Sequence, residues 1–382
     1  MTAAPAIDRR SLMAMDPTLL LSGLLLVAIG LIAISSASIE YGDWHFQNAW
    51  HHTQRHLVYI VIALTAAAVV YHVPPAFWLD TGWVWLFLAL ALLILVLVPG
   101  IGKDVNGSQR WLPLGPFTLQ PSEFAKLALV IYLAGYLVRQ EHEVRNEWQG
   151  FIKPMAVLGS VALLLMVEPD FGATVIAVGT AFGMLFLAGV KLRHFLLVLA
   201  VSLLGMLGLI FSAPYRVARL TAYTDPWADP FGSGFQLIQS LIAFGRGQWF
   251  GVGLGNSVQK LFYLPEAHTD FVFSIWAEET GFIGALLVMS LYAVLVGRVL
   301  WVARRAARVA DNFGAYVCYG VAFIFSGQAF VNMGVSSGLL PTKGLTLPFI
   351  SYGGTSLIMC CCMLAMVLRI ERELRQPPGG AV

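Results

Sequence analysis

Long apolar stretches, separated by shorter polar ones, dominate this chain. Ten of them have the length and hydrophobicity of membrane-crossing helices, and they are centred near Leu26, Leu64, Leu90, Ile131, Leu163, Phe182, Leu203, Leu286, Phe323 and Met363. Lipid offers no partners to free backbone groups, so each stretch is expected to be helical. The pattern predicts an all-α, polytopic membrane protein with about ten transmembrane helices.

Most of the polar stretches are short, with one clear exception. Residues 213–269, between the seventh and eighth spans, form a loop far longer than an ordinary connection. Within this loop, residues 235–244 place four apolar side chains on one helix face: Leu237, Ile238, Leu241 and Ile242. This spacing predicts a short amphipathic helix that lies at the membrane surface.

The composition supports the membrane assignment and excludes other classes. Of the 382 residues, 58% are hydrophobic and only 12% are charged, which is more apolar surface than a soluble domain can bury. A net charge of +2 is too small to suggest nucleic-acid binding. Cys318 and the run Cys360, Cys361 and Cys362 lie within apolar spans. They are predicted to be small buried hydrophobic residues rather than disulfides or metal ligands.

The distribution of basic residues predicts the orientation of the spans. The side that holds the N-terminus carries 14 of the 23 lysines and arginines, the opposite side carries 8, and Lys126 lies within a span. We therefore expect cytoplasmic tails at 1–16 and 373–382 around a transmembrane domain at 17–372. The apolar run at 19–34 exceeds the apolar core of a signal peptide, about 7–15 residues, which predicts an uncleaved first helix.

A group of polar residues stands where the long loop meets the eighth span. Asp270 lies at this border, with Glu266 and His268 beside it. A carboxylate at the edge of a membrane is costly to desolvate, so Asp270 is a candidate functional group. Alternatively, Thr269 or Asp270 is the N-cap of the following helix and accepts hydrogen bonds from its free N–H groups. The two roles are compatible.

Two further polar motifs stand beside spans on the same side. In residues 120–126, Ser122 is a candidate N-cap, and Glu123 and Lys126 share a helix face. These two charges either pair with each other, or Lys126 faces an internal cavity and meets a substrate phosphate. The motif at 168–172 interrupts an apolar stretch. It is either a tight turn between two spans or a place where two carboxylates hold a metal ion or a sugar.

Acids and bases gather on the side opposite the tails. The bases there are Arg110, Lys126, Arg216, Arg219, Arg246 and Lys343, and the acids are Glu123, Asp170 and Asp270. Cations that hold a diphosphate, beside a carboxylate that deprotonates a sugar hydroxyl, suit a lipid-linked substrate. The glycine-rich residues 245–255 either cradle phosphate through their N–H groups or form a flexible connector. The sequence contains no Walker loop and no dinucleotide fingerprint.

Four motifs in this order identify a resemblance to a known family. They are QPSEFAK at 120–126, EPDFG at 168–172, GLGNSVQKLFYLPEAHTDF at 253–271, and LPTKGL with ISYGG within 340–354. Together they resemble the SEDS family (shape, elongation, division and sporulation proteins), from the first span to about Arg372. The motifs at 256–263 and 341–344 look more like its division branch than its elongation branch.

The resemblance implies a peptidoglycan glycosyltransferase that polymerises lipid II on the outer face of the inner membrane, at the division septum. Asp270 matches the family's essential aspartate, the expected general base, and Glu123, Lys126 and Asp170 match polar positions that line its cavity. We further expect substrate contacts from basic residues and a neighbouring histidine: Arg110, Arg216, Arg246, His268 and Lys343. The resemblance also implies that a divalent cation (Mg²⁺ or Mn²⁺) can assist, although no ligand set in the sequence indicates where.

The resemblance implies partners as well. It implies a class B penicillin-binding protein, the division transpeptidase FtsI, and activation by the FtsQ–FtsL–FtsB subcomplex. Two other functions fit the residues. Broken helices with intramembrane charges are also typical of a transporter, here a lipid II flippase, and a non-enzymatic division scaffold is the second alternative.

Overall fold

The computed structural model describes residues 15–105, 108–115, 117–211, 223–341 and 344–375. The helices are α2 (Pro17–Phe46), α3 (His51–His72), α4 (Pro75–Leu97), α5 (Pro121–Arg139), α6 (Glu141–Asn146), α7 (Trp148–Val167), α8 (Phe171–Leu187), α9 (Leu192–Phe211), α11 (Phe235–Gly247), α12 (Val272–Arg308), α13 (Asn312–Ser336) and α14 (Gly354–Arg375), with a short 3₁₀ helix at Pro226–Ala228. The strands are β1 (Lys103–Val105), β2 (Ser108–Leu114) and β3 (Phe117–Leu119).

The helical membrane architecture predicted from the sequence is confirmed. Each of the ten predicted centres lies in a separate helix, and eight of these helices are long and apolar enough to cross a membrane. The other two, α8 and α9, are shorter apolar helices. All four cysteines are free and buried, as expected.

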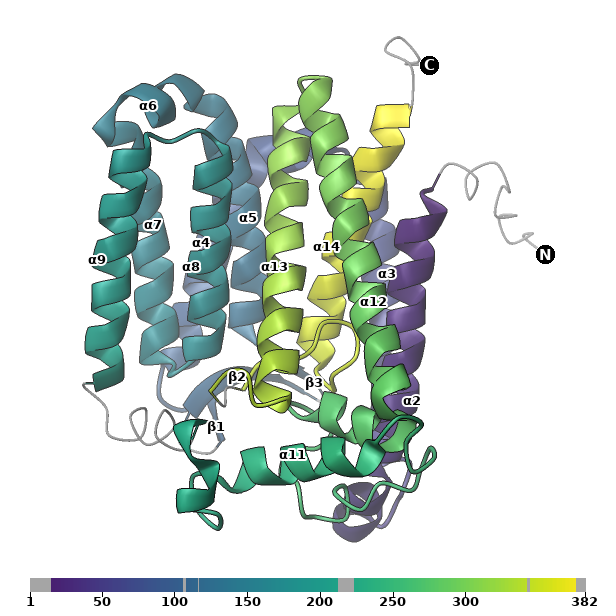
Figure 1. Cartoon of the computed structure of the whole chain (residues 1–382). Coiled ribbons are helices and arrows are strands. Elements are labelled where there is room, and N and C mark those ends of the chain that lie inside the picture. The colour runs from purple at the N-terminus through teal and green to yellow at the C-terminus, as the bar shows by residue number, and fades with distance from the viewer. Residues whose placement is uncertain (1–14, 106–107, 116, 212–222, 342–343, 376–382) are drawn as a thin grey trace, which may run out of the picture.

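The bundle has two distinct ends. The start of α2, the short helix α6 and the end of α14 lie toward the top of Figure 1, at the end of the bundle that we call the tail end. The small sheet and α11 lie at the opposite end, which we call the loop end (Figure 1). The polar motifs predicted to share one side of the membrane are therefore brought to the loop end.

Helix α5 is at the centre of the bundle. It packs against α4, α8, α13 and α14, and most of its residues are buried, whereas only a minority of the residues of α3 and α4 are buried. Because α5 begins at the loop end, its first turn carries Glu123 and Lys126 into the interior. The interior of the bundle therefore receives two charges from its central helix.

The antiparallel sheet β1–β2–β3 was not predicted from the sequence. In β2–β3, Leu112 pairs with Leu119 and Leu114 with Phe117. Its strands are only three to seven residues long, too short to show a clear alternation. The sheet is tied to α14 through the Thr355 hydroxyl, which donates to Thr118 O (3.0 Å) and accepts from Gln120 N (3.1 Å).

The amphipathic helix predicted in the long loop is present as α11 (Phe235–Gly247). Leu237 and Ile238 are buried, and α11 packs against α12 and α13 across the loop end (Figure 1). The Ser240 hydroxyl, also buried, lies 2.6 Å from Ser274 Oγ and 2.5 Å from Ser336 O. Part of the apolar face therefore contacts the rest of the protein, whereas Ile242 is exposed, and the predicted position at the membrane surface stays a prediction.

Candidate active site

A polar cavity of about 1110 Å³ opens at the loop end. Its wall is assembled from the start of α3, the sheet, the start of α5, the α7–α8 turn, and the segments that precede α12 and α14. The charged and ring-bearing residues of the wall include His52, Arg55, Tyr59, Lys103, Arg110, Trp111, Glu123, Asp170, Glu266, Asp270 and Tyr352. Such a volume is at the upper end for a small-molecule site.

Asp270 lies on the cavity wall, immediately before α12. The N-cap of α12 is Phe271, without a side-chain hydrogen bond, and Thr269 bonds to Glu266 Oε2 (2.6 Å). The capping alternative for Asp270 and Thr269 was therefore wrong. The buried side chain of Asn332 fixes the position of Asp270, because its Nδ2 donates to Asp270 O (2.9 Å) and to Leu345 O (2.6 Å).

Gly344 leaves room for the Asp270 carboxylate. A Cβ at residue 344 would lie 2.9 Å from Asp270 Oδ2, which is too close for ordinary contact. The final segment before α14 therefore approaches the carboxylate with bare backbone. Both residues border the cavity.

Glu123 and Lys126 pair with each other, which was the first of the two alternatives. Lys126 Nζ lies 2.8 Å from Glu123 Oε1, and both side chains are buried. Glu123 lines the cavity, whereas Lys126 is not among its lining residues. The charge of Lys126 is thus matched by Glu123 inside the bundle, and its contact with a substrate phosphate stays a prediction.

The motif at 168–172 forms the predicted turn between α7 and α8. Asp170 caps α8 by accepting from Ala173 N (3.1 Å). Its other oxygen, Oδ2, accepts from Ser122 Oγ (3.0 Å) and Gln120 Nε2 (3.4 Å). Ser122 is therefore not the N-cap of α5; Gln120 holds that position, and the Ser122 hydroxyl bonds to Asp170 instead.

Glu168 is buried beside this turn, and neither of its carboxyl oxygens has a hydrogen-bond partner in the described part of the chain. Burial, and to a lesser extent the charge of Asp170, raises the pKa of Glu168 to about 8. The carboxyl is therefore largely protonated at neutral pH. Arg110 reaches the same turn, but its guanidinium donates to the backbone carbonyls of Glu168 (3.2 Å) and Pro169 (2.6 Å).

The remaining predicted binding residues are distributed differently. Arg110 lines the cavity, but Arg246 does not: it lies 3.5 Å from Glu278 Oε1 in a separate cluster. The prediction that Arg246 contacts substrate is thus not supported by its position. Lys343, Arg216 and Arg219 fall outside the described residues.

His268 is held in a group of rings next to the cavity rather than on its wall. Its ring centroid lies 4.9 Å from that of His52, 5.3 Å from that of Tyr41 and 5.8 Å from that of Tyr352. Burial lowers the pKa of His268, and the nearby charge of Glu266 opposes this shift. The ring is therefore expected to be neutral at pH 7.

Sequence reasoning missed several residues of the wall, among them His52, Arg55, Tyr59 and Lys103. The first three were detectable, because positions 52, 55 and 59 recur at the spacing of one helix face at the start of α3. Lys103 could not be placed from the sequence, because the sheet that brings it to the cavity was not predicted.

The resemblance to the family implies a divalent cation, for which acidic and histidine side chains would be the ligands. Among the residues that the structure describes, no group of three or more His, Cys, Asp or Glu side chains is arranged to hold a metal ion. The cavity instead combines acids, among them Asp270, with basic side chains from other elements, Arg55, Lys103 and Arg110. This arrangement can bind an anionic group and accept a proton beside it.

Fold and site together define a polytopic membrane protein with a polar, cation-lined cavity at one end of its helix bundle. Residues 17–376 match the family model of the FtsW, RodA and SpoVE cell cycle proteins. The chain belongs to this family, which confirms the resemblance seen in its motifs.

Individual relatives agree with this assignment. The chain is 52% identical to the probable peptidoglycan glycosyltransferase FtsW of Pseudomonas fluorescens, over 96% of this chain and 90% of the relative. It is 54% identical to the protein of the same description from Hahella chejuensis, over 94% and 91% of the two chains. Both names agree with the expected similarity to the division branch.

Solved structures share the fold. A chain from a peptidoglycan synthase complex, described as showing structural coordination of polymerization and crosslinking, is 30% identical with a TM-score of 0.76. The rod shape determining protein RodA of Thermus thermophilus is 28% identical with a TM-score of 0.71. In both cases the match covers 96% of this chain and the whole of the other.

Proposed function

We propose that Asp270 is the general base of a membrane-embedded peptidoglycan glycosyltransferase, and that the cavity is its reaction site. The chain is a peptidoglycan glycosyltransferase that polymerises lipid II into glycan strands. The observation that carries the role of Asp270 is its position on the wall of a 1110 Å³ cavity that also presents Arg55, Lys103 and Arg110.

The reaction requires a nucleophile and a leaving group, and the cavity supports both. A sugar hydroxyl is a weak nucleophile, so the Asp270 carboxylate takes its proton as the oxygen attacks the anomeric carbon of the donor. The bond between that carbon and the lipid diphosphate breaks, and undecaprenyl diphosphate leaves with the electron pair. Arg110 and the neighbouring basic side chains stabilise the charge on the diphosphate.

The location and partners belong to the same proposal. The excess of basic residues on the side of the tails supports cytoplasmic termini and a loop end that faces the periplasm. The relatives named FtsW support action at the division septum. The neighbour found in a synthase complex that couples polymerization to crosslinking supports a class B penicillin-binding protein, the transpeptidase FtsI, as partner. Activation by FtsQ–FtsL–FtsB completes the proposed assembly.

The test is reconstitution of the full chain with its transpeptidase partner and lipid II, followed by detection of glycan strands. Asp270→Asn and Asp270→Ala are expected to reduce strand formation at least ~10²-fold, because the base is lost. Asp80→Asn is the matched control, since Asp80 is an exposed aspartate in α4 that does not line the cavity. It should retain full activity.

The same experiment distinguishes the alternatives. Normal strand formation by Asp270→Asn would refute the assignment of the base. Lipid II translocation that persists in that variant, with no strands formed by the native protein, would indicate a flippase. Binding of the transpeptidase with neither activity would indicate a scaffold.

A further inference from the structure

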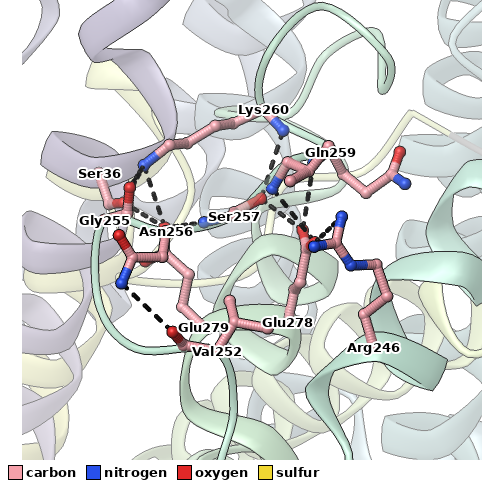
Figure 2. Close-up of polar contacts among 11 residues, drawn as sticks. Ser36, Arg246, Val252, Gly255, Asn256, Ser257, Gln259, Lys260, Glu278 and Glu279 are labelled. Atoms are coloured by element: carbon pink, nitrogen blue, oxygen red, sulfur yellow. Dashed lines mark hydrogen bonds and ion pairs between the residues drawn. The ribbon is translucent and has the colours of Figure 1, made fainter.

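A second buried charged cluster lies at the loop end, apart from the cavity lining. Its members are Ser36 from α2, Arg246 from α11, Ser257, Val258, Gln259 and Lys260 from the segment before Asp270, and Glu278 and Glu279 from α12. We call it the double-glutamate cluster, and Figure 2 shows its contacts. The site described above uses none of these side chains.

Glu279 joins the loop to two helices. Its Oε1 lies 3.2 Å from Lys260 Nζ and accepts hydrogen bonds from Ser36 Oγ (2.5 Å) and Ser257 N (3.3 Å). Lys260 Nζ also donates to Ser36 Oγ (3.1 Å) and to Gly255 O (2.6 Å), as Figure 2 shows. The side chains of Lys260 and Glu279 are 5% and 1% exposed, so water provides no alternative partners for this pair.

Glu278 holds the adjacent turn of the same loop. It accepts hydrogen bonds from Ser257 Oγ, from Val258 N (3.2 Å) and from Gln259 N (3.3 Å). Arg246 NH1 lies 3.5 Å from its Oε1 (Figure 2). Consecutive backbone N–H groups that point at one carboxylate form a compact anion site, so this turn is held to α12 by charge and geometry together.

A break in α12 places both glutamates at the end of a short helix. Gly281 has φ 70° and ψ −167°, which separates residues 272–280 from 282–308. The glycine-rich loop occupies the break: Val252 N and Gly253 N donate to the carbonyls of Glu278 and Glu279 (both 3.0 Å). These two N–H groups are therefore not available to cradle a phosphate. The loop replaces hydrogen bonds that the helix loses.

The cluster anchors both ends of the chain segment that carries Asp270. The segment leaves the cluster at Lys260, passes Asp270, and returns to the cluster at Glu278 through the short helix 272–280. Residues ten positions before Asp270 and eight positions after it are thus anchored at one place. A displacement of Glu278 would be transmitted to Asp270, because the nine-residue helix between them is a rigid element about 13 Å long.

We propose that Lys260, Glu278 and Glu279 are positioning residues that hold the Asp270 carboxylate at the cavity. This proposal rests on the proposed function, in which Asp270 is the base. A buried ion pair adds little net stability compared with packed apolar residues, but it selects one geometry, because each charge is satisfied only by its own partners. Catalysis is sensitive to displacements of the reacting groups of about 1 Å.

The test measures the turnover number and KM of strand formation for the full chain with its transpeptidase partner. Glu279→Gln and Lys260→Met each leave one charge unmatched, and both are expected to reduce kcat at least tenfold with KM within twofold of the native value. Lys260→Arg retains the charge and is expected to keep at least a third of the native kcat. Glu373→Gln is the matched control, because it breaks an exposed glutamate–arginine pair at the tail end (Arg369, 2.9 Å).

The readouts separate a positioning role from other roles. Activities are expressed per folded molecule, from size-exclusion profiles and thermal unfolding in detergent. A decrease in kcat that the loss of folded protein fully explains would overturn the proposal, and so would a rise in KM with unchanged kcat. If Asp270→Asn is inactive while Glu279→Gln and Lys260→Met are fully active, only the positioning role fails. If Asp270→Asn is active, the proposed base itself fails.

Discussion

Two pairs of buried acids lie at helix breaks near the loop end, and their surroundings differ. Glu278 and Glu279, at the break of α12, each accept several hydrogen bonds, and each forms an ion pair with a basic side chain. Between α7 and α8, Asp170 accepts three hydrogen bonds, whereas the carboxyl of Glu168 accepts none from the described residues. Asp170 lines the cavity, and the α12 pair does not.

The difference shows that burial alone does not tell whether an acid holds the structure together or changes its protonation with pH. Donors around Glu278 and Glu279 satisfy both carboxylates and fix their direction. Glu168 has no such donors, so its pKa rises to about 8 and its charge changes near physiological pH. Glu278 and Glu279 are therefore expected to fix the position of the chain segments around them. Glu168 is expected to make the stability of the protein depend on pH.

The largest effect is expected where the donors are most numerous. Glu278→Ala would leave the Ser257 hydroxyl, two backbone N–H groups and the Arg246 guanidinium without their partner. We expect a loss of about 3–5 kcal/mol in the free energy of unfolding, the usual cost of breaking a buried charge network. Thermal or denaturant unfolding in detergent measures this loss.

A matched control is available in the same protein. Glu40→Ala removes an exposed glutamate from α2, and its stability should remain within about 0.5 kcal/mol of the native value. A Glu278→Ala variant as stable as Glu40→Ala would show that the cluster does not hold the fold, and the contrast between the two acid pairs would disappear.

A smaller effect, visible as a dependence on pH, is expected at Glu168. Its pKa of about 8 in the folded protein exceeds the ordinary value of 4.5, so between these values the folded state binds a proton that the unfolded state has released. The free energy of unfolding therefore falls as pH rises from about 4.5 to about 8. Glu168→Gln should flatten this slope, as measured by melting temperature across that range.

Glu147 provides the comparison for Glu168, because it is exposed and lies just before the same helix α7 that Glu168 follows. Glu147→Gln should leave the slope of the native protein intact. Identical pH profiles for the native protein and Glu168→Gln would contradict a raised pKa and would place Glu168 with the fully partnered acids.

The smallest effect is expected at His268, on the acid side. Burial lowers its pKa below the ordinary 6.5, so the unfolded state takes up a proton that the folded state refuses. The stability that the neutral ring contributes is therefore present above pH 6.5 and lost as pH falls below it. His268→Gln should reduce the loss of melting temperature between pH 7 and pH 5, whereas His142→Gln, at an exposed site, should not. Equal losses in the two variants would contradict the shift.

The fold was largely predictable, and the site only in part. Each apolar stretch can be recognised as a helix from its own residues, because the backbone groups of a segment surrounded by lipid must form hydrogen bonds within that segment. Asp270 was identifiable for the same reason, since a carboxylate at the edge of a span is visible in the sequence. The hydrogen-bond partners of the site residues could not be predicted from the sequence. Ser122 and Asp270 were plausible helix caps, but Ser122 bonds to Asp170 and Asp270 lies on the cavity wall.

The amino-acid sequence by itself determined the ten apolar helices, the one long loop between the seventh and eighth of them, and an acid where that loop meets the next helix. The tertiary structure alone decided which charges are matched: Lys126 by Glu123, Arg246 by Glu278, and Lys260 by Glu279 and by Ser36 of a helix more than two hundred residues away. It also decided which acids border the cavity. The physical reason is that hydropathy acts on contiguous residues, whereas burial of a charge depends on donors that only folding brings together.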